Sequence, residues 1–171
     1  MIYEILGNSF DSNGIELKNK KEIITVNGRL ASEKAGFTLP HEHLLVDFTG
    51  ADHYDPLKWD RKQVIDAVKP FLDEIKLMGC STFVDCTPEY LGRDPEMLKN
   101  LSDLTGLNIM TNTGYYGAQK NKFLPHSVFS QSEEAIAEIW IKEFNMVIGS
   151  SGIRPGFIKM VLIMMNSHLF I

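Results

Sequence analysis

The sequence of 171 residues has few cysteines, no long apolar run and no strong excess of one charge. Lysine and arginine number 17 against 22 acidic residues, which gives a formal net charge of −5. A mildly acidic chain with scattered charges is poorly suited to a phosphate backbone, so we expect no nucleic-acid partner. The apolar run at 160–165 is far shorter than the roughly 20 residues that span a bilayer, so we also expect no membrane partner.

The two cysteines, Cys80 and Cys86, bracket a predicted strand. Six residues of strand extend about 20 Å, whereas a disulfide needs its two Cα atoms within about 7 Å. We therefore expect two free thiols, which is typical of a reducing compartment such as the cytoplasm.

Strand-like and helix-like segments alternate after an irregular, polar leading segment at 1–22. Residues 23–31 predict a small hairpin around Asn27-Gly28. Such an alternation implies a parallel sheet, and half of an eight-stranded barrel and a small open sheet both fit it. Strands are predicted at 37–43, 81–86, 107–111 and 156–160, with helices at 60–78, from 94 to Gly106 and from 132. The first helix is expected to gather Val64, Ile65, Val68, Phe71, Leu72 and Ile75 on one face.

The most informative motif is Pro40-His41-Glu42-His43, at the end of the first long strand. Residues i and i+2 of a strand point to the same face, so His41 and His43 present two imidazoles side by side. Such a pair suits one metal ion, while Glu42 points to the opposite face. A surface or packed pair of histidines is the alternative interpretation.

Other polar residues lie in or after the later strands. Lys159 lies in an apolar strand, where a lysine is costly unless it is paired or neutralised. Three interpretations fit Lys159: a reactive lysine with a lowered pKa, a carbamate that bridges metals, or a residue at a strand end whose side chain reaches solvent. Asp85 either supports a ligand histidine or caps the next loop. Tyr115 and Tyr116 suit either a pocket wall or loop packing.

Four motifs in register, at 35–43, 92–94, 112–116 and 152–159, resemble the phosphotriesterase family of the amidohydrolase superfamily. The resemblance covers roughly residues 23–160 and is greatest to the phosphotriesterase-related and lactonase-like branch. It implies an α/β fold, the N-terminal half of a (β/α)8 TIM-type barrel preceded by a small β-hairpin. The barrel would be incomplete in this chain.

The resemblance also implies a metal-dependent hydrolase. Family members use a binuclear centre, usually of zinc, whose activated hydroxide attacks an ester, lactone or phosphotriester. Carried over, His41 and His43 would ligate the more buried ion, and Lys159 would bridge both ions as a carboxylated lysine. Tyr115 and Tyr116 would wall the pocket for a small-molecule substrate. A homodimer of the complete protein is compatible with the resemblance.

The resemblance ends near residue 160. The family supplies two further histidines and an aspartate from later strands, and His168 follows Lys159 too soon to be one of them. Segment 161–171 lacks the polar loop and amphipathic helix expected there, so we interpret it as an aberrant tail. We therefore expect this chain alone to be inactive. The alternatives are a truncated, non-enzymatic product and a small α/β domain that binds metal through His41 and His43.

Overall fold

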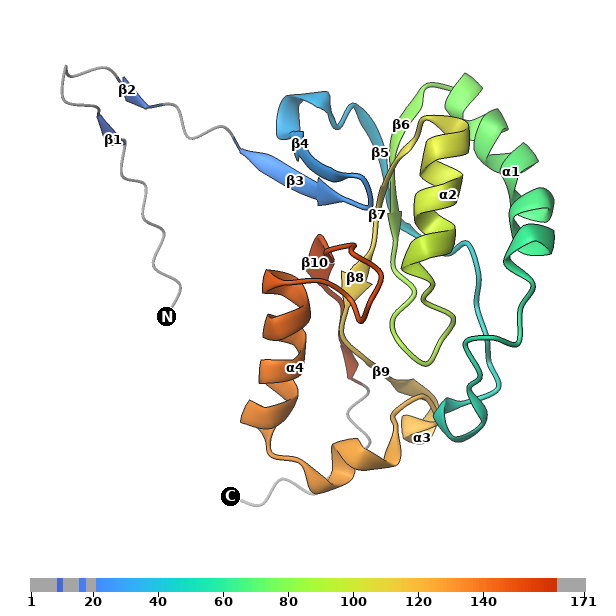
Figure 1. The fold of residues 1–171 in the computed structure, drawn as a ribbon, viewed down its shortest axis with the longest axis vertical. Helices are drawn as coiled ribbons and strands as arrows, with labels where there is room; N and C mark the ends of the chain where they lie inside the picture. Colours follow the sequence, from blue (N-terminus) through green and yellow to red (C-terminus); the bar gives the residue numbers. More distant parts are fainter. Residues whose placement is uncertain (1–8, 11–15, 18–20, 163–171) are drawn as a thin grey trace.

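The structure is a computed structural model that describes residues 9–10, 16–17 and 21–162. Figure 1 shows the strands in the middle of the molecule, with helices on both flanks. No helix in these ranges is long and apolar enough to cross a lipid bilayer.

Parallel strands follow one another across the molecule in sequence order. The central three-stranded sheet has the order β5-β6-β7, and its neighbouring strands pair in parallel. β8 continues β7 after one residue and pairs in parallel with β10. This order is that of the first four strands of an α/β barrel, and it does not close into a barrel within the described residues. The bounds are Phe37–Glu42 (β5), Cys80–Asp85 (β6), Asn108–Met110 (β7), Asn112–Thr113 (β8) and Phe157–Ile158 (β10).

Three longer helices connect these strands: α1 (Arg61–Leu77), α2 (Pro95–Thr105) and α4 (Glu133–Asn145). Figure 1 places α1 and α2 together on one flank and α4 on the other. Each helix begins after a side chain that accepts a hydrogen bond from a backbone N–H of the first turn. The prediction of alternating strands and helices is confirmed, and the capping residues are Asp60, Asp94 and Ser132.

The buried core lies between the sheet and helices α1 and α2. One prediction about α1 is wrong, because Phe71 is 68% exposed. The buried stripe of α1 passes through Leu72, and adjacent residues on a helix point about 100° apart, so Phe71 faces solvent. The core contains Leu72, Phe83, Met97, Leu98, Leu101, Leu107 and Ile109.

The predicted hairpin is present as β3 (Glu22–Thr25) and β4 (Gly28–Ala31), which pair antiparallel. Its turn begins one residue earlier than predicted, because Val26 is buried in the core and donates its N–H to Ile109 O at 2.8 Å. Gly156 lies directly against the hairpin, and a Cβ there would be 2.5 Å from the carbonyl oxygen of Ile24.

Short strands occupy the described parts of the two terminal segments. β1 (Ser9–Phe10) pairs antiparallel with β2 (Glu16–Leu17), inside the predicted leading segment. β11 (Val161–Leu162), at the start of the predicted tail, pairs in parallel with β9 (Tyr116–Gly117). His168 lies outside the described residues.

α3 (Ala118–Asn121), which follows β9, is a short turn with left-handed backbone inside it. The two cysteines, Cys80 and Cys86, are free, as predicted.

Candidate metal centre

His41 and His43 lie side by side at the end of β5. Their ring centroids are 5.4 Å apart, with the ring planes inclined at 59°. Both side chains are exposed, whereas the intervening Glu42 is partly buried and accepts the N–H of Cys86 at its carbonyl. The two imidazoles therefore have the arrangement that the alternation of a strand predicts.

Lys159 directly follows β10, with its N–H donated to the carbonyl of Thr113 at 2.7 Å. Partial burial of the ring lowers the pKa of His43, and the positive charges of His41 and Lys159 lower it further. Lys159 is thus near enough to act on the His43 ring. The structure brings the three predicted metal ligands into one region at the carboxyl ends of the strands.

These residues fit a metal centre in part. Neutral imidazoles are good ligands for zinc, and two are present here. Within the described ranges, no group of three or more histidine, cysteine, aspartate or glutamate residues is arranged to hold a metal. An ammonium group at Lys159 would repel a cation, whereas a carbamate would supply anionic oxygen. His41 and His43 would therefore hold the metal, and Lys159 would join them only when carboxylated.

The ring of His43 contacts Thr87, with 2.9 Å between Nδ1 and Oγ1. Thr87 in turn donates its backbone N–H to Asp85 Oδ1 at 2.9 Å, and Leu44 donates its N–H to Asp85 Oδ2 at 3.0 Å. Burial raises the pKa of Asp85 to about 6, against the lowering effect of these hydrogen bonds. Asp85 therefore caps the segments that follow β5 and β6, and Thr87 links it to His43.

A second carboxylate, that of Glu143 on α4, holds the end of β8. It accepts hydrogen bonds from Arg93 Nη1 at 2.8 Å, Arg93 Nη2 at 3.2 Å and Thr113 Oγ1 at 2.7 Å. Arg93 is itself buried and also donates to the carbonyl of Asn112 at 2.9 Å. Because Thr113 also accepts the N–H of Lys159, this pair supports the strand from which Lys159 extends.

Gly114 allows the two strands to approach closely at this point. Its φ is +120°, and an added Cβ would overlap the carbonyl oxygen of Lys159. Only glycine combines this backbone conformation with this close approach.

Tyr115 and Tyr116, the predicted pocket walls, contact different neighbours. Tyr115 is 7% exposed and packs between Tyr90 and Trp140, at centroid distances of 5.8 and 5.4 Å. Burial raises the pKa of Tyr115 to about 12. Tyr116 packs against Phe123 at 5.5 Å. Tyr115 lines an apolar cavity of about 460 Å³ beside α4, and a role for either tyrosine in substrate binding stays a prediction.

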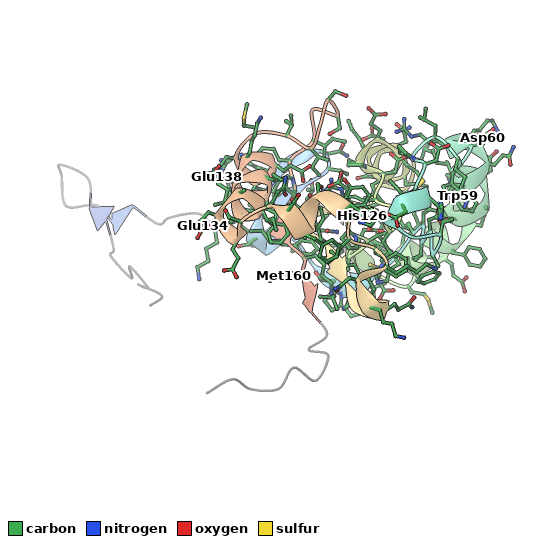
Figure 2. The ribbon with its side chains drawn as sticks, turned by 90° about the horizontal axis from the view of Figure 1, so that it is seen from below. Trp59, Asp60, His126, Glu134, Glu138 and Met160 are labelled. Carbon is green, nitrogen blue, oxygen red and sulfur yellow. The ribbon has the colours of Figure 1, made fainter. Side chains whose placement is uncertain are left out.

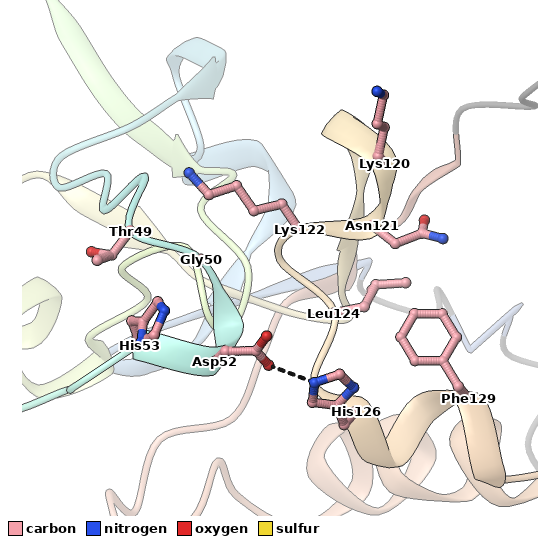
Figure 3. Close-up of a pocket in the computed structure, with 10 residues that line it drawn as sticks. All are labelled: Thr49, Gly50, Asp52, His53, Lys120, Asn121, Lys122, Leu124, His126 and Phe129. Atoms are coloured by element: carbon pink, nitrogen blue, oxygen red, sulfur yellow. Dashed lines mark ion pairs between the residues drawn. The ribbon is translucent and has the colours of Figure 1, made fainter.

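A second cavity, of about 420 Å³, lies between the loop after β5 and the segment after β9. Asp52 and His126 face each other there, with 3.3 Å between Oδ1 and Nε2 (Figure 3). Figure 2 shows His126 on the underside of the molecule, between the side of α4 that carries Glu134 and the loop that carries Trp59. None of the predicted site residues lines this cavity.

Three supporting residues were not identified from the sequence. Thr87 has a weak signal, since it comes two positions after Asp85 at a strand end. Arg93 belongs to a motif that carried the family resemblance, although no role followed from that. Glu143 has no local signal, because its partner Arg93 lies 50 positions away in the sequence.

Comparison with known proteins supports the arrangement of the strands. The model of the phosphotriesterase family matches residues 21–165. The chain belongs to the phosphotriesterase family. Over 129 residues it is 25% identical to the phosphotriesterase homology protein of Escherichia coli. The matched region covers 75% of this chain and 42% of that protein. Over 130 residues it is 28% identical to the aryldialkylphosphatase of Saccharolobus solfataricus. The matched region covers 76% of this chain and 40% of that protein.

Solved structures of phosphotriesterases show the same fold. The organophosphorus hydrolase from Deinococcus radiodurans matches with a TM-score of 0.72 and 31% identity, over 80% of this chain and 42% of that one. An organophosphate-hydrolysing protein engineered from a weak promiscuous lactonase matches with a TM-score of 0.72 and 29% identity, over 81% and 44%. The chain thus spans about two fifths of the length of these relatives, and the predicted half of a TIM-type barrel is confirmed.

Proposed function

We propose that residues 23–160 form the N-terminal half of a metal-dependent hydrolase that acts on a small-molecule ester, lactone or phosphotriester. The observation that carries this proposal is the pair of adjacent imidazoles of His41 and His43, close to Lys159. They lie at the carboxyl ends of the strands, where α/β barrels build their active sites. The names of the relatives, an aryldialkylphosphatase and an organophosphorus hydrolase, support this reaction class.

Some residues of this chain would bind the metal, and others orient or support those residues. His41 and His43 would hold a divalent ion, for which zinc is the best match to imidazole ligands. A carboxylated Lys159 would bind this ion and also a second zinc ion. When bound, the metal supplies Lewis-acid activation of water and of a substrate oxygen. Thr87 orients the His43 ring, and Glu143 supports the strand end beside Lys159.

The proposal extends to the activity of this chain alone, its compartment and its partners. The described residues contain only part of a binuclear ligand set, so we propose that this chain alone is inactive. The free thiols of Cys80 and Cys86 favour the cytoplasm. A homodimer of the complete protein stays a prediction, as does the absence of nucleic-acid and membrane partners.

Zinc titration of the 171-residue chain tests the proposal. We expect the unmodified chain to bind one zinc ion weakly, because only part of the ligand set is present, and we expect His43→Ala to lose that binding. His126→Ala is the matched control, because it removes another exposed histidine, which forms an ion pair with Asp52. An unmodified chain that binds no zinc would contradict the proposal. Zinc binding without hydrolysis of paraoxon or a lactone would agree with inactivity of this chain alone.

A further inference from the structure

The apolar cavity beside α4 has a volume of about 460 Å³. Pockets that bind small molecules have volumes of about 300–1,000 Å³, and an apolar cavity of about 150 Å³ is already large enough for benzene. None of the three predicted metal ligands lines this cavity, so what it binds is a question separate from the metal centre. Its apolar walls include Leu124, Val128, Ile136, Trp140 and Val161.

The cavity has a buried part and an exposed rim. Tyr115 and Gly117 are buried and line the inner part, whereas Glu133 and Met160 are exposed and form the rim. Figure 2 shows Met160 on the underside of the molecule. Water finds few hydrogen-bond partners on apolar walls, so an apolar group that replaces it is favoured.

The rim of the cavity carries negative charge. Of the described residues that line the cavity, Glu133 is the only charged one, and none is a lysine, arginine or histidine. The same helix, α4, also carries Glu134 and Glu138. A cationic group beside Glu133 is therefore favoured over an anionic one. Because Glu133 is exposed, solvent weakens this preference to a few-fold.

We propose that this cavity binds a small alkylammonium ion, with its apolar chain between α4 and β11 and its ammonium group beside Glu133. The proposal goes beyond the proposed function and needs no metal, so each can hold if the other fails. An alcohol of the same chain length would bring no charge to the rim, and an alkanoate would bring its carboxylate against Glu133. The expected order of affinity is therefore alkylamine, alcohol, alkanoate.

Titration with octylamine, octanol and octanoate in metal-free buffer at pH 7.5 tests the proposal. Trp140 lines the cavity, and the only other tryptophan of the chain is Trp59. In Trp59→Phe the fluorescence therefore reports on Trp140 alone. We expect octylamine to bind a few-fold more tightly than octanol, and octanoate to bind most weakly. Each CH₂ group removed from the amine should lower the affinity by up to about fourfold.

Two substitutions on α4 locate the bound chain. Ile136 lines the cavity, whereas Ile141 does not line it and is 51% exposed. In Ile136→Phe we expect octylamine to bind about tenfold more weakly, because the ring takes the place of about two CH₂ groups of the ligand. Ile141→Phe should leave the affinity unchanged. If Ile136→Phe does not fold, Val161→Phe fills the same cavity from β11.

A second pair of variants tests the head group. Glu133→Gln should remove the preference for octylamine over octanol and leave the affinity for octanol unchanged. Glu134→Gln is the control, because Glu134 lies on the same helix but does not line the cavity, and it should keep the preference.

Three results would overturn the proposal. The first is an unmodified chain that binds none of the three ligands. The second is octanoate that binds as tightly as octylamine. The third is octylamine affinity that is unchanged in a folded Ile136→Phe or Val161→Phe, which would place the ligand elsewhere. Zinc binding is measured separately, so none of these results decides the proposed function.

Discussion

The carboxylates of Asp85 and Glu143 support the two sides of the candidate metal centre, and they are stabilised in different ways. Asp85, on the His43 side, accepts backbone N–H groups from Leu44 and Thr87, and its pKa is raised to about 6 by burial. Glu143, on the Lys159 side, forms a bidentate ion pair with the buried guanidinium of Arg93.

The difference follows from what each carboxylate joins. Asp85 ends β6 and joins two adjacent strand ends, whose backbone N–H groups are close at hand. Glu143 comes from α4 and must hold a strand and a distant loop together, which an arginine does with several donors at once. Asp85 forms no ion pair within the described residues and can take up a proton, whereas removal of Arg93 leaves the charge of Glu143 without compensation. The two sides should therefore respond differently to substitution and to pH.

The largest expected effect is the loss of stability in Arg93→Met. Glu143 would lose its buried cation, and Glu89, whose Oε2 lies 3.5 Å from Arg93 Nη2, would lose it too. Breaking a buried pair in this way typically costs about 3–5 kcal/mol. The free energy of unfolding in urea measures the loss. Arg29→Met, which breaks an exposed pair with Glu22, should cost at most about 1 kcal/mol. Equal losses in both variants would contradict the special role of the buried pair.

Gly114→Ala should disturb the Lys159 side alone. The methyl group would overlap the carbonyl oxygen of Lys159 at a φ of +120°. We expect a loss of about 3 kcal/mol in the free energy of unfolding, at the upper end of the range for overpacking. Gly149→Ala is the control, since its φ is +52° with no atom within 4 Å, and it should cost about 1–2 kcal/mol. If both substitutions cost the same, the backbone angle rather than the overlap is responsible.

A smaller and pH-dependent effect is expected on the His43 side. The pKa of Asp85 is raised from 3.8 to about 6, so the folded state binds the proton more tightly than the unfolded state. The stabilising contribution of this proton is complete below pH 3.8 and is lost as the pH rises through about 6. Relative to Asp85→Asn, the unmodified chain should gain about 2 kcal/mol between pH 7.5 and pH 4.5. Urea denaturation at both pH values measures this, and a difference that does not change with pH would contradict it.

Local features of the fold were predictable because each depends on neighbours in the sequence. The alternation of β5 placed His41 and His43 together, and the start of a helix at Asp94 was predicted from the sequence. The exposure of Phe71 was not predictable, because it depends on which stripe of α1 meets the sheet. Periodicity shows that a helix has an apolar face but sets its edges only roughly.

The supports of the site depend on distant residues and therefore escaped prediction. Thr87 lies 44 positions from His43, and Arg93 lies 50 positions from Glu143. No local pattern encodes such a pairing, since only the parallel order of the strands brings these segments together. The family motifs marked Arg93 but gave no indication of its partner.

The contact of Gly156 with the hairpin limits how this part of the protein can be rearranged in evolution. Ile24 lies at the beginning of the barrel half and Gly156 at its end, and Val26 and Ile153 share one buried cluster. Removing the hairpin would open that cluster to water. A recombination point between the hairpin and β5 would therefore separate two pieces that share their core. The hairpin and the barrel half therefore pack as one unit, and the hairpin is not a detachable appendage.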